Sequence, residues 1–105
     1  MFNIDSAPCF WETVTVRLPN AEPESFRARF QVMPVSAFKQ IDLGDPDQVA
    51  GFLETTVTDL EDIEDGSGPL PFSGPLLARL IDRPDIRAGL VRAYVEGIGR
   101  AAQGN

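Results

Sequence analysis

The chain has 105 residues, of which 43% are hydrophobic and 24% are charged, and its formal net charge is −7. These values are typical of one small globular domain and exclude a wholly disordered chain, so we expect a single domain over residues 1–105 with mobile ends at residues 1–9 and 102–105. The negative charge disfavours nucleic acid as a partner, and no apolar run approaches the ~18 residues of a membrane helix.

Charge is unevenly distributed along the chain, and the cysteine content indicates the compartment. Residues 40–78 contain nine acidic residues and no basic one, whereas residues 1–39 are balanced and residues 79–105 carry five arginines against three acids. The single cysteine, Cys9, excludes an internal disulfide, and the chain begins with methionine and shows no signal-peptide pattern. We therefore expect a protein of the reducing cytoplasm, with no membrane partner.

Two stretches near the N-terminus alternate apolar and polar residues, as strands do. Residues 10–18 form the first, and residues 26–32 form the second, with Arg27 and Arg29 on its polar face. The linking residues 19–25 are rich in turn formers, so the two strands are predicted to pair as an antiparallel hairpin. Arg27 and Arg29 are candidate partner-binding residues on the outer face, and two solvated arginines are the alternative.

A helix is predicted over residues 45–56, where the apolar spacing becomes helical. Asp45 can serve as its N-cap, and Pro46 stands at the first helical position. The N–H that proline lacks would have no hydrogen-bond acceptor within the helix at that position. Gln48 stands three residues after the cap, as in a capping box. The helix then presents one apolar stripe to the core, formed by Val49, Phe52, Leu53 and Thr56.

Three further helices complete the expected fold. A short helix over residues 36–41 is predicted to begin at Ser36, a second helix over residues 73–81 at Ser73, and the last covers residues 84–101. The resulting class is α+β: an N-terminal antiparallel β-hairpin packed against three to four helices, with the longest helix at the C-terminus.

Residues 60–73 combine an acidic cluster with glycines and prolines, which suggests a calcium loop. An EF-hand register with Gly66 at position 6 puts Ile63 at position 3 and Phe72 at position 12, where ligating oxygens are required. The spacing therefore excludes that loop, and a carboxylate pair for catalysis has no cleft to hold it. We expect a connector that reverses at residues 66–68 and then turns Phe72 inward.

The sequence offers no other catalytic or cofactor-binding constellation. It contains no histidine, which removes the commonest general base and metal ligand. Cys9 has no basic partner nearby in sequence, and no phosphate loop follows the glycines of the connector. We expect no catalytic residue, no metal, no cofactor and no enzyme activity.

The last helix carries more apolar surface than a core contact needs. Its apolar residues spread over roughly 200° of the helical wheel, against the ~100° stripe that docks a helix on its own core. Either the helix is enclosed within the domain, or a flank with Val91, Val95 and Ala102 faces another chain while Ile86, Leu90 and Tyr94 hold the core. Val91 and Val95 are therefore candidate partner-binding residues. Arg87 lies in the same arc and is a third candidate, since a buried guanidinium needs a partner; the alternative is that it reaches solvent.

The order of these features resembles a known family. It runs from FW at residues 10–11 and FRARF at 26–30, through VTD at 57–59, DIEDG at 62–66 and PLPFS at 69–73, to RPDIR at 83–87 and AYVE at 93–96. Over residues 10–105 the chain resembles the small tail assembly chaperones of long-tailed bacteriophages and prophages. Leu60 departs from the pattern, which has an aromatic residue there.

The resemblance implies a non-enzymatic role in virion assembly. Such chaperones bind the tape measure protein, a long helical polypeptide, keep it soluble and help to recruit tail tube subunits. Many are also made in a longer, frameshifted form, and self-association into a homo-oligomer is a further expectation. The alternative from another class is a structural head–tail joining or tail-completion protein that stays in the virion.

Overall fold

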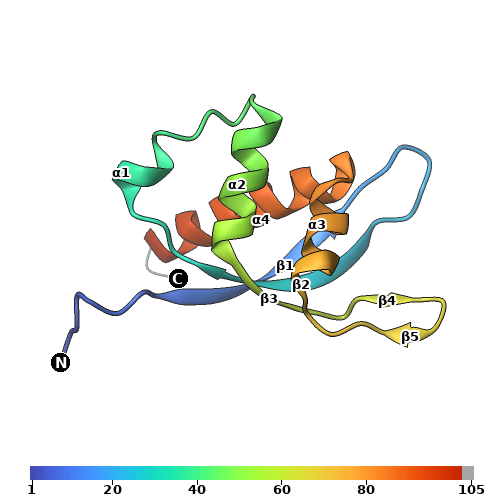
Figure 1. Cartoon of the computed structure of the whole chain (residues 1–105), viewed down its shortest axis with the longest axis horizontal. Helices are drawn as coiled ribbons and strands as arrows, with labels where there is room; N and C mark the ends of the chain where they lie inside the picture. Colours follow the sequence, from blue (N-terminus) through green and yellow to red (C-terminus); the bar gives the residue numbers. More distant parts are fainter. Residues whose placement is uncertain (103–105) are drawn as a thin grey trace.

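A computed structural model describes residues 1–102, with side chains to residue 100. Figure 1 shows an α+β fold in which the helices lie together on one side of a small sheet, and the predicted fold class is confirmed. The elements are, in chain order, β1 (Cys9–Val16), β2 (Glu24–Gln31), α1 (Val35–Phe38), α2 (Pro46–Thr56), β3 (Val57–Glu61), β4 (Glu64–Asp65), β5 (Gly68–Pro69), α3 (Gly74–Ile81) and α4 (Pro84–Ala102). Of the ends predicted to be mobile, Cys9 belongs to β1, and residues 103–105 lie outside the described residues.

The main sheet has the order β1-β2-β3 and is antiparallel throughout. The predicted hairpin is confirmed, with Phe10 opposite Phe30 and Val14 opposite Phe26. The third strand was not predicted, and it follows α2 without a loop. β3 pairs with β2 through a bulge, because Arg29 faces Asp59 whereas the next residue, Phe30, faces Val57.

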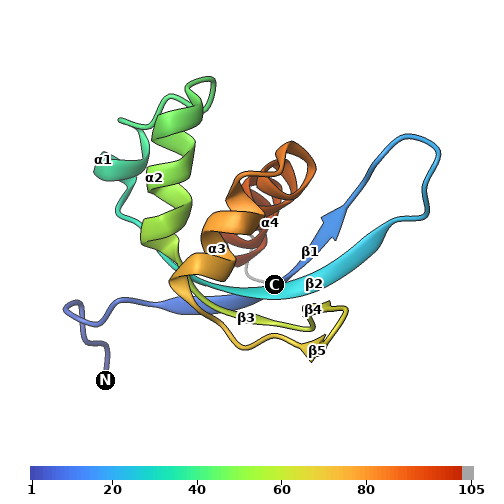
Figure 2. The same ribbon diagram turned by 45° about the vertical axis from the view of Figure 1, so that its right-hand side comes forward.

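One face of the sheet is covered and the other is open. Figure 2 shows α2, α3 and α4 on the same side of the strands. The alternation predicted for β2 is confirmed, since Phe26, Ala28 and Phe30 are buried under the helices while Arg27 and Arg29 are exposed. The large side chains buried most completely are Phe30, Phe52, Leu53, Leu90 and Val14, which join the sheet to α2 and α4.

The start of α2 follows the prediction in part. The Asp45 side chain accepts a hydrogen bond from the Asp47 N–H (3.0 Å), and Pro46 is the first helical residue. Gln48 does not complete a capping box: its Oε1 accepts from the Asp42 N–H (2.8 Å) and its Nε2 donates to the Asp45 carboxylate (3.1 Å). Gln48 therefore fastens the preceding turn to the helix.

The two other predicted caps had different outcomes. Ser73 caps α3 as expected, since its Oγ accepts from the Leu76 N–H (3.1 Å). Ser36 is not a cap, because α1 already begins at Val35 after Pro34 and has no side-chain cap. The fixed φ of Pro34 is itself compatible with a helix start, so the short helix begins one residue earlier than predicted.

The acidic connector forms the small β4–β5 hairpin, which confirms the predicted reversal at residues 66–68. Asp65 accepts hydrogen bonds from the Ser67 hydroxyl (2.6 Å) and N–H (2.8 Å), and the first of these is the main reason that the pKa of Asp65 is lowered. The inward placement of Phe72 was wrong, since its side chain is 37% exposed. Leu70 packs against the core instead, with its N–H bonded to the Ile63 carbonyl.

Candidate partner-binding site

Helix α4 packs directly against β1 through a face made of small residues. Gly89, Ala93 and Gly97 follow one another at intervals of four residues and so share a face. A Cβ at position 89 would lie 2.8 Å from the carbonyl oxygen of Thr15, and a Cβ at position 97 would collide with the ring of Phe10. The spacing of these small residues is visible in the sequence, but this contact was not predicted from it.

An ion pair joins the far end of the same contact. Arg100, in the last turns of α4, forms a salt bridge with Glu12 of β1. Glu12 projects from the covered face of its strand, between Phe10 and Val14. The pair therefore lies at the margin of the packed layer and fixes the C-terminal part of α4 on the sheet.

The core-facing side of α4 is held by large side chains, as predicted. Ile86, Leu90 and Tyr94 are all buried. The ring of Tyr94 lies 5.0 Å from that of Phe52 and 5.7 Å from that of Phe30, in edge-to-face arrangements that aromatic pairs favour. Its hydroxyl accepts a hydrogen bond from the Met33 N–H (3.0 Å), just beyond β2.

A groove of about 620 Å³ lies on the remaining side of α4, between this helix and the start of α2. We call it the α4 groove. Its apolar lining consists of Leu43, Pro46, Val49, Pro84, Ala88, Val91 and Val95. Both predicted valines are therefore brought together there, with Val91 half-buried and Val95 46% exposed. The Ala102 side chain, which was predicted beside them, lies outside the described residues.

A second, smaller hollow of about 150 Å³ lies on the other side of Val95. It is lined by Val32, Met33, Val35, Phe38, Tyr94, Val95 and Ile98. Val95 thus forms a ridge between two apolar depressions. Val35 at the outer margin is 80% exposed, so the apolar surface continues from α4 onto α1.

Arg87 lies at one end of the α4 groove, where it links three helices. Its Nε donates to the carbonyl of Ile81 at the end of α3, and its Nη1 donates to the carbonyl of Pro46 at the start of α2, both at 2.8 Å. Carbonyl oxygens therefore take the place of the acidic partner that burial was expected to require. Arg92 and Glu96, both exposed, line the other polar part of the groove.

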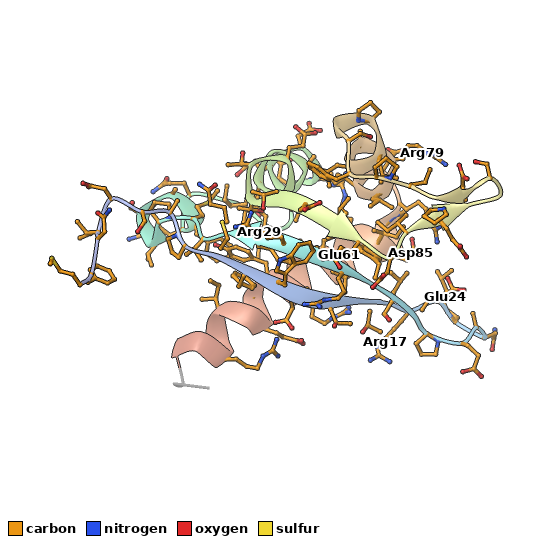
Figure 3. All side chains as sticks on the ribbon, turned by 90° about the horizontal axis from the view of Figure 1, so that it is seen from below. Arg17, Glu24, Arg29, Glu61, Arg79 and Asp85 are labelled. Carbon is orange, nitrogen blue, oxygen red and sulfur yellow. The ribbon has the colours of Figure 1, made fainter. Side chains whose placement is uncertain are left out.

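Arg27 and Arg29 lie on the open face of the sheet and not with the α4 groove. Figure 3 views the molecule from below and labels Arg29 and Glu61 on neighbouring strands. In the strand register Arg27 is opposite Glu61 and Arg29 is opposite Asp59. The guanidinium carbon of Arg27 lies 5.5 Å from the centre of the Trp11 ring, a cation–π distance. The five candidate residues thus belong to two separate surfaces.

Comparison with protein-family models, curated proteins and solved structures found no match for this chain. Among the residues that the structure describes, no three side chains of histidine, cysteine, aspartate or glutamate are grouped so that they could hold a metal ion. Within the same residues, no helix has the length and apolar character needed to cross a membrane.

Proposed function

We propose that this chain is a tail assembly chaperone of a long-tailed bacteriophage or prophage. It acts without catalysis in the bacterial cytoplasm, where it binds a helical segment of the tape measure protein and helps to bring tail tube subunits to it. The observation that carries this proposal is the α4 groove, an open apolar surface on a helix whose core contacts are complete without it. The choice of the tape measure protein as partner rests on the resemblance of residues 10–105 to tail assembly chaperones.

The groove suits a helical client for physical reasons. An amphipathic helix binds by placing apolar residues spaced at three and four positions into an apolar groove. Val91 and Val95 stand one helical turn apart and supply such a surface. Arg92 and Glu96 lie beside them and can pair with charges on either side of a client's apolar stripe.

Co-expression with the tape measure protein of the same genome tests this proposal. We expect the two proteins to co-purify, and we expect Val95→Asp to abolish the complex while the fold survives, because this side chain is already 46% exposed. Leu18→Asp is the matched control, since Leu18 is 50% exposed but belongs to the β1–β2 connection. The proposal fails if the wild-type chain does not bind or if the Val95 variant binds equally well.

Mass spectrometry of purified virions separates a chaperone from a structural protein. A chaperone is lost before the tail is complete and should be missing from the particles. A protein that joins the head to the tail would be found there at a fixed copy number, and that result would replace the present proposal.

A further inference from the structure

The large apolar side chains that remain exposed fall mainly into two groups. Among the described residues eight such side chains are exposed: Met1, Phe2, Ile4, Leu18, Val35, Leu43, Phe72 and Val95. Three of them surround the α4 groove and the adjoining hollow, and three lie within four residues near the N-terminus. Exposed apolar clusters of this kind mark contact surfaces. The protein therefore carries one apolar hollow and one apolar projection.

The projection is residues 1–8, here called the N-terminal arm. Its base is fixed, because the Pro8 carbonyl accepts a hydrogen bond from the Val32 N–H (2.8 Å). Beyond that point a turn at Asn3 bends it: the Asn3 side chain accepts from the Asp5 N–H (2.9 Å), and its carbonyl accepts from the Ser6 hydroxyl (2.8 Å). Figures 1 and 2 both show the arm leaving the end of the sheet and bending away from the helices. Phe2 and Ile4 are 89% and 84% exposed and so make little contact with their own domain.

We propose that the N-terminal arm of one copy binds in the α4 groove of a second copy, with Phe2 and Ile4 against its apolar lining. The groove volume of about 620 Å³ lies within the ~300–1,000 Å³ of pockets that enclose small ligands. Eight extended residues span up to about 26 Å, which equals the shortest of the three extents of the chain (26 Å), so an extended arm can reach onto the surface of an adjacent copy.

Charge complementarity favours the same occupant. The charged part of the groove lining carries both signs, on Arg87, Arg92 and Glu96. The arm also carries both signs, on the carboxylate of Asp5 and the N-terminal ammonium group of Met1, so Asp5 can pair with an arginine of the groove and the ammonium group with Glu96. Because the arm and the groove are different surfaces, each arm–groove contact joins two unlike patches. Two copies that exchange arms reciprocally form a closed dimer, whereas one-way binding links copies into a chain.

The mass of the full chain in solution, measured over a series of concentrations, tests the proposal. We expect the wild type to associate. The double variant Phe2→Asp with Ile4→Asp and the single variant Val95→Asp should each raise the dissociation constant about tenfold or more, equivalent to ~1.4 kcal/mol or more. The control Leu18→Asp should associate as the wild type does. Circular dichroism melting curves verify that each variant is folded.

Mixing the variants gives a positive test that destabilisation alone would not pass. The arm variant keeps an intact groove and the groove variant keeps an intact arm, so an equimolar mixture should form hetero-oligomers through the one remaining contact. A wild type that is monomeric at every concentration, an association that survives the arm substitutions, or a mixture that stays monomeric would each overturn the proposal.

This inference stands independently of the tape measure protein. The arm variant keeps its own groove, so a client that binds the groove should still bind it. Loss of self-association together with retained client binding in the arm variant would support both proposals separately. Self-association that persists in the arm variant together with retained client binding would reject this inference alone.

Discussion

Two faces of α4 show two different ways of using a helix surface. The face toward β1 has the stripe Gly89, Ala93 and Gly97, and it is buried because side chains are missing from it. The face toward the α4 groove has Val91 and Val95, and it stays open although its side chains are apolar. Side-chain hydrophobicity alone therefore does not show which face of a helix is covered. The local shape of the opposing surface decides which face is covered. Substitutions on the β1 side should therefore lower stability, whereas substitutions of exposed side chains on the groove side should lower binding and leave stability almost unchanged.

Among substitutions on these two faces of α4, Gly89→Ala on the β1 side should have the largest effect. The new Cβ would lie 2.8 Å from the carbonyl oxygen of Thr15, which is backbone of a paired strand and cannot move aside. We expect the free energy of unfolding to fall by about 1–3 kcal/mol, the usual range for overpacking, in urea denaturation.

Gly99→Ala is the matched control, because its Cβ would meet nothing within 4 Å. Alanine favours a helix over glycine by up to ~1 kcal/mol, so this variant should be as stable as the wild type or more stable. If both substitutions had the same effect, close contact between α4 and β1 would not be what anchors the helix.

A smaller loss of unfolding free energy is expected from Arg87→Met, which tests whether the hydrogen bonds of Arg87 hold α2 and α3 beside α4. The variant removes the bonds to the carbonyls of Ile81 and Pro46 but keeps the length of the side chain. Because Arg87 is only partly buried and water can replace some of these bonds, we expect a loss of about 1–2 kcal/mol in thermal or urea unfolding.

Arg92→Met is the companion to this variant, since Arg92 lines the same groove from an exposed position. Surface changes of this type usually alter stability by less than ~0.5 kcal/mol. Equal losses in the two variants would show that the carbonyl bonds of Arg87 do not link α2 and α3 to α4.

Val95→Asp should change stability least among the α4 substitutions that alter binding. A side chain that is 46% exposed can hydrate a carboxylate, so we expect a change in unfolding free energy within ~0.5 kcal/mol. Leu90→Ala on the buried side is the contrast, with a loss of about 2–5 kcal/mol. A large loss in the Val95 variant would mean that the groove belongs to the core.

The sequence predicted the elements whose signals are local. The hairpin follows from strict alternation in residues 26–32, and α2 and α3 follow from caps at Asp45 and Ser73. Strand β3 was missed for an identifiable reason. Its two buried side chains, Val57 and Leu60, are three positions apart because of the bulge, and that spacing is typical of a helix.

The site was predicted only in part, because its shape depends on contacts between distant residues. The helical wheel indicated a surplus flank on α4 and placed Val91 and Val95 on it. It could not show that α2 would leave that flank open, nor that Arg87 would bond to Pro46, a residue 41 positions away. The glycine stripe was not predicted because a helical wheel shows where apolar side chains gather, whereas this contact depends on the absence of side chains.

The smallest expected effect concerns the N-terminus of α4, which belongs to neither face. Arg83 bonds to Asp85 (2.6 Å), and this bond is the main reason that the pKa of Asp85 is lowered from its ordinary value of 3.8. A lowered pKa in the folded state means stabilisation that is present above pH 3.8 and lost as the pH falls through the lowered value. Asp85→Asn should therefore lower the melting temperature slightly near neutrality, where the wild-type ion pair is formed, and the two curves should converge in acid, which leaves the variant with a flatter acid limb. Asp82→Asn removes the same charge nearby without breaking this ion pair and should leave that limb unchanged; if it flattened the limb equally, general repulsion among the acids would be the cause.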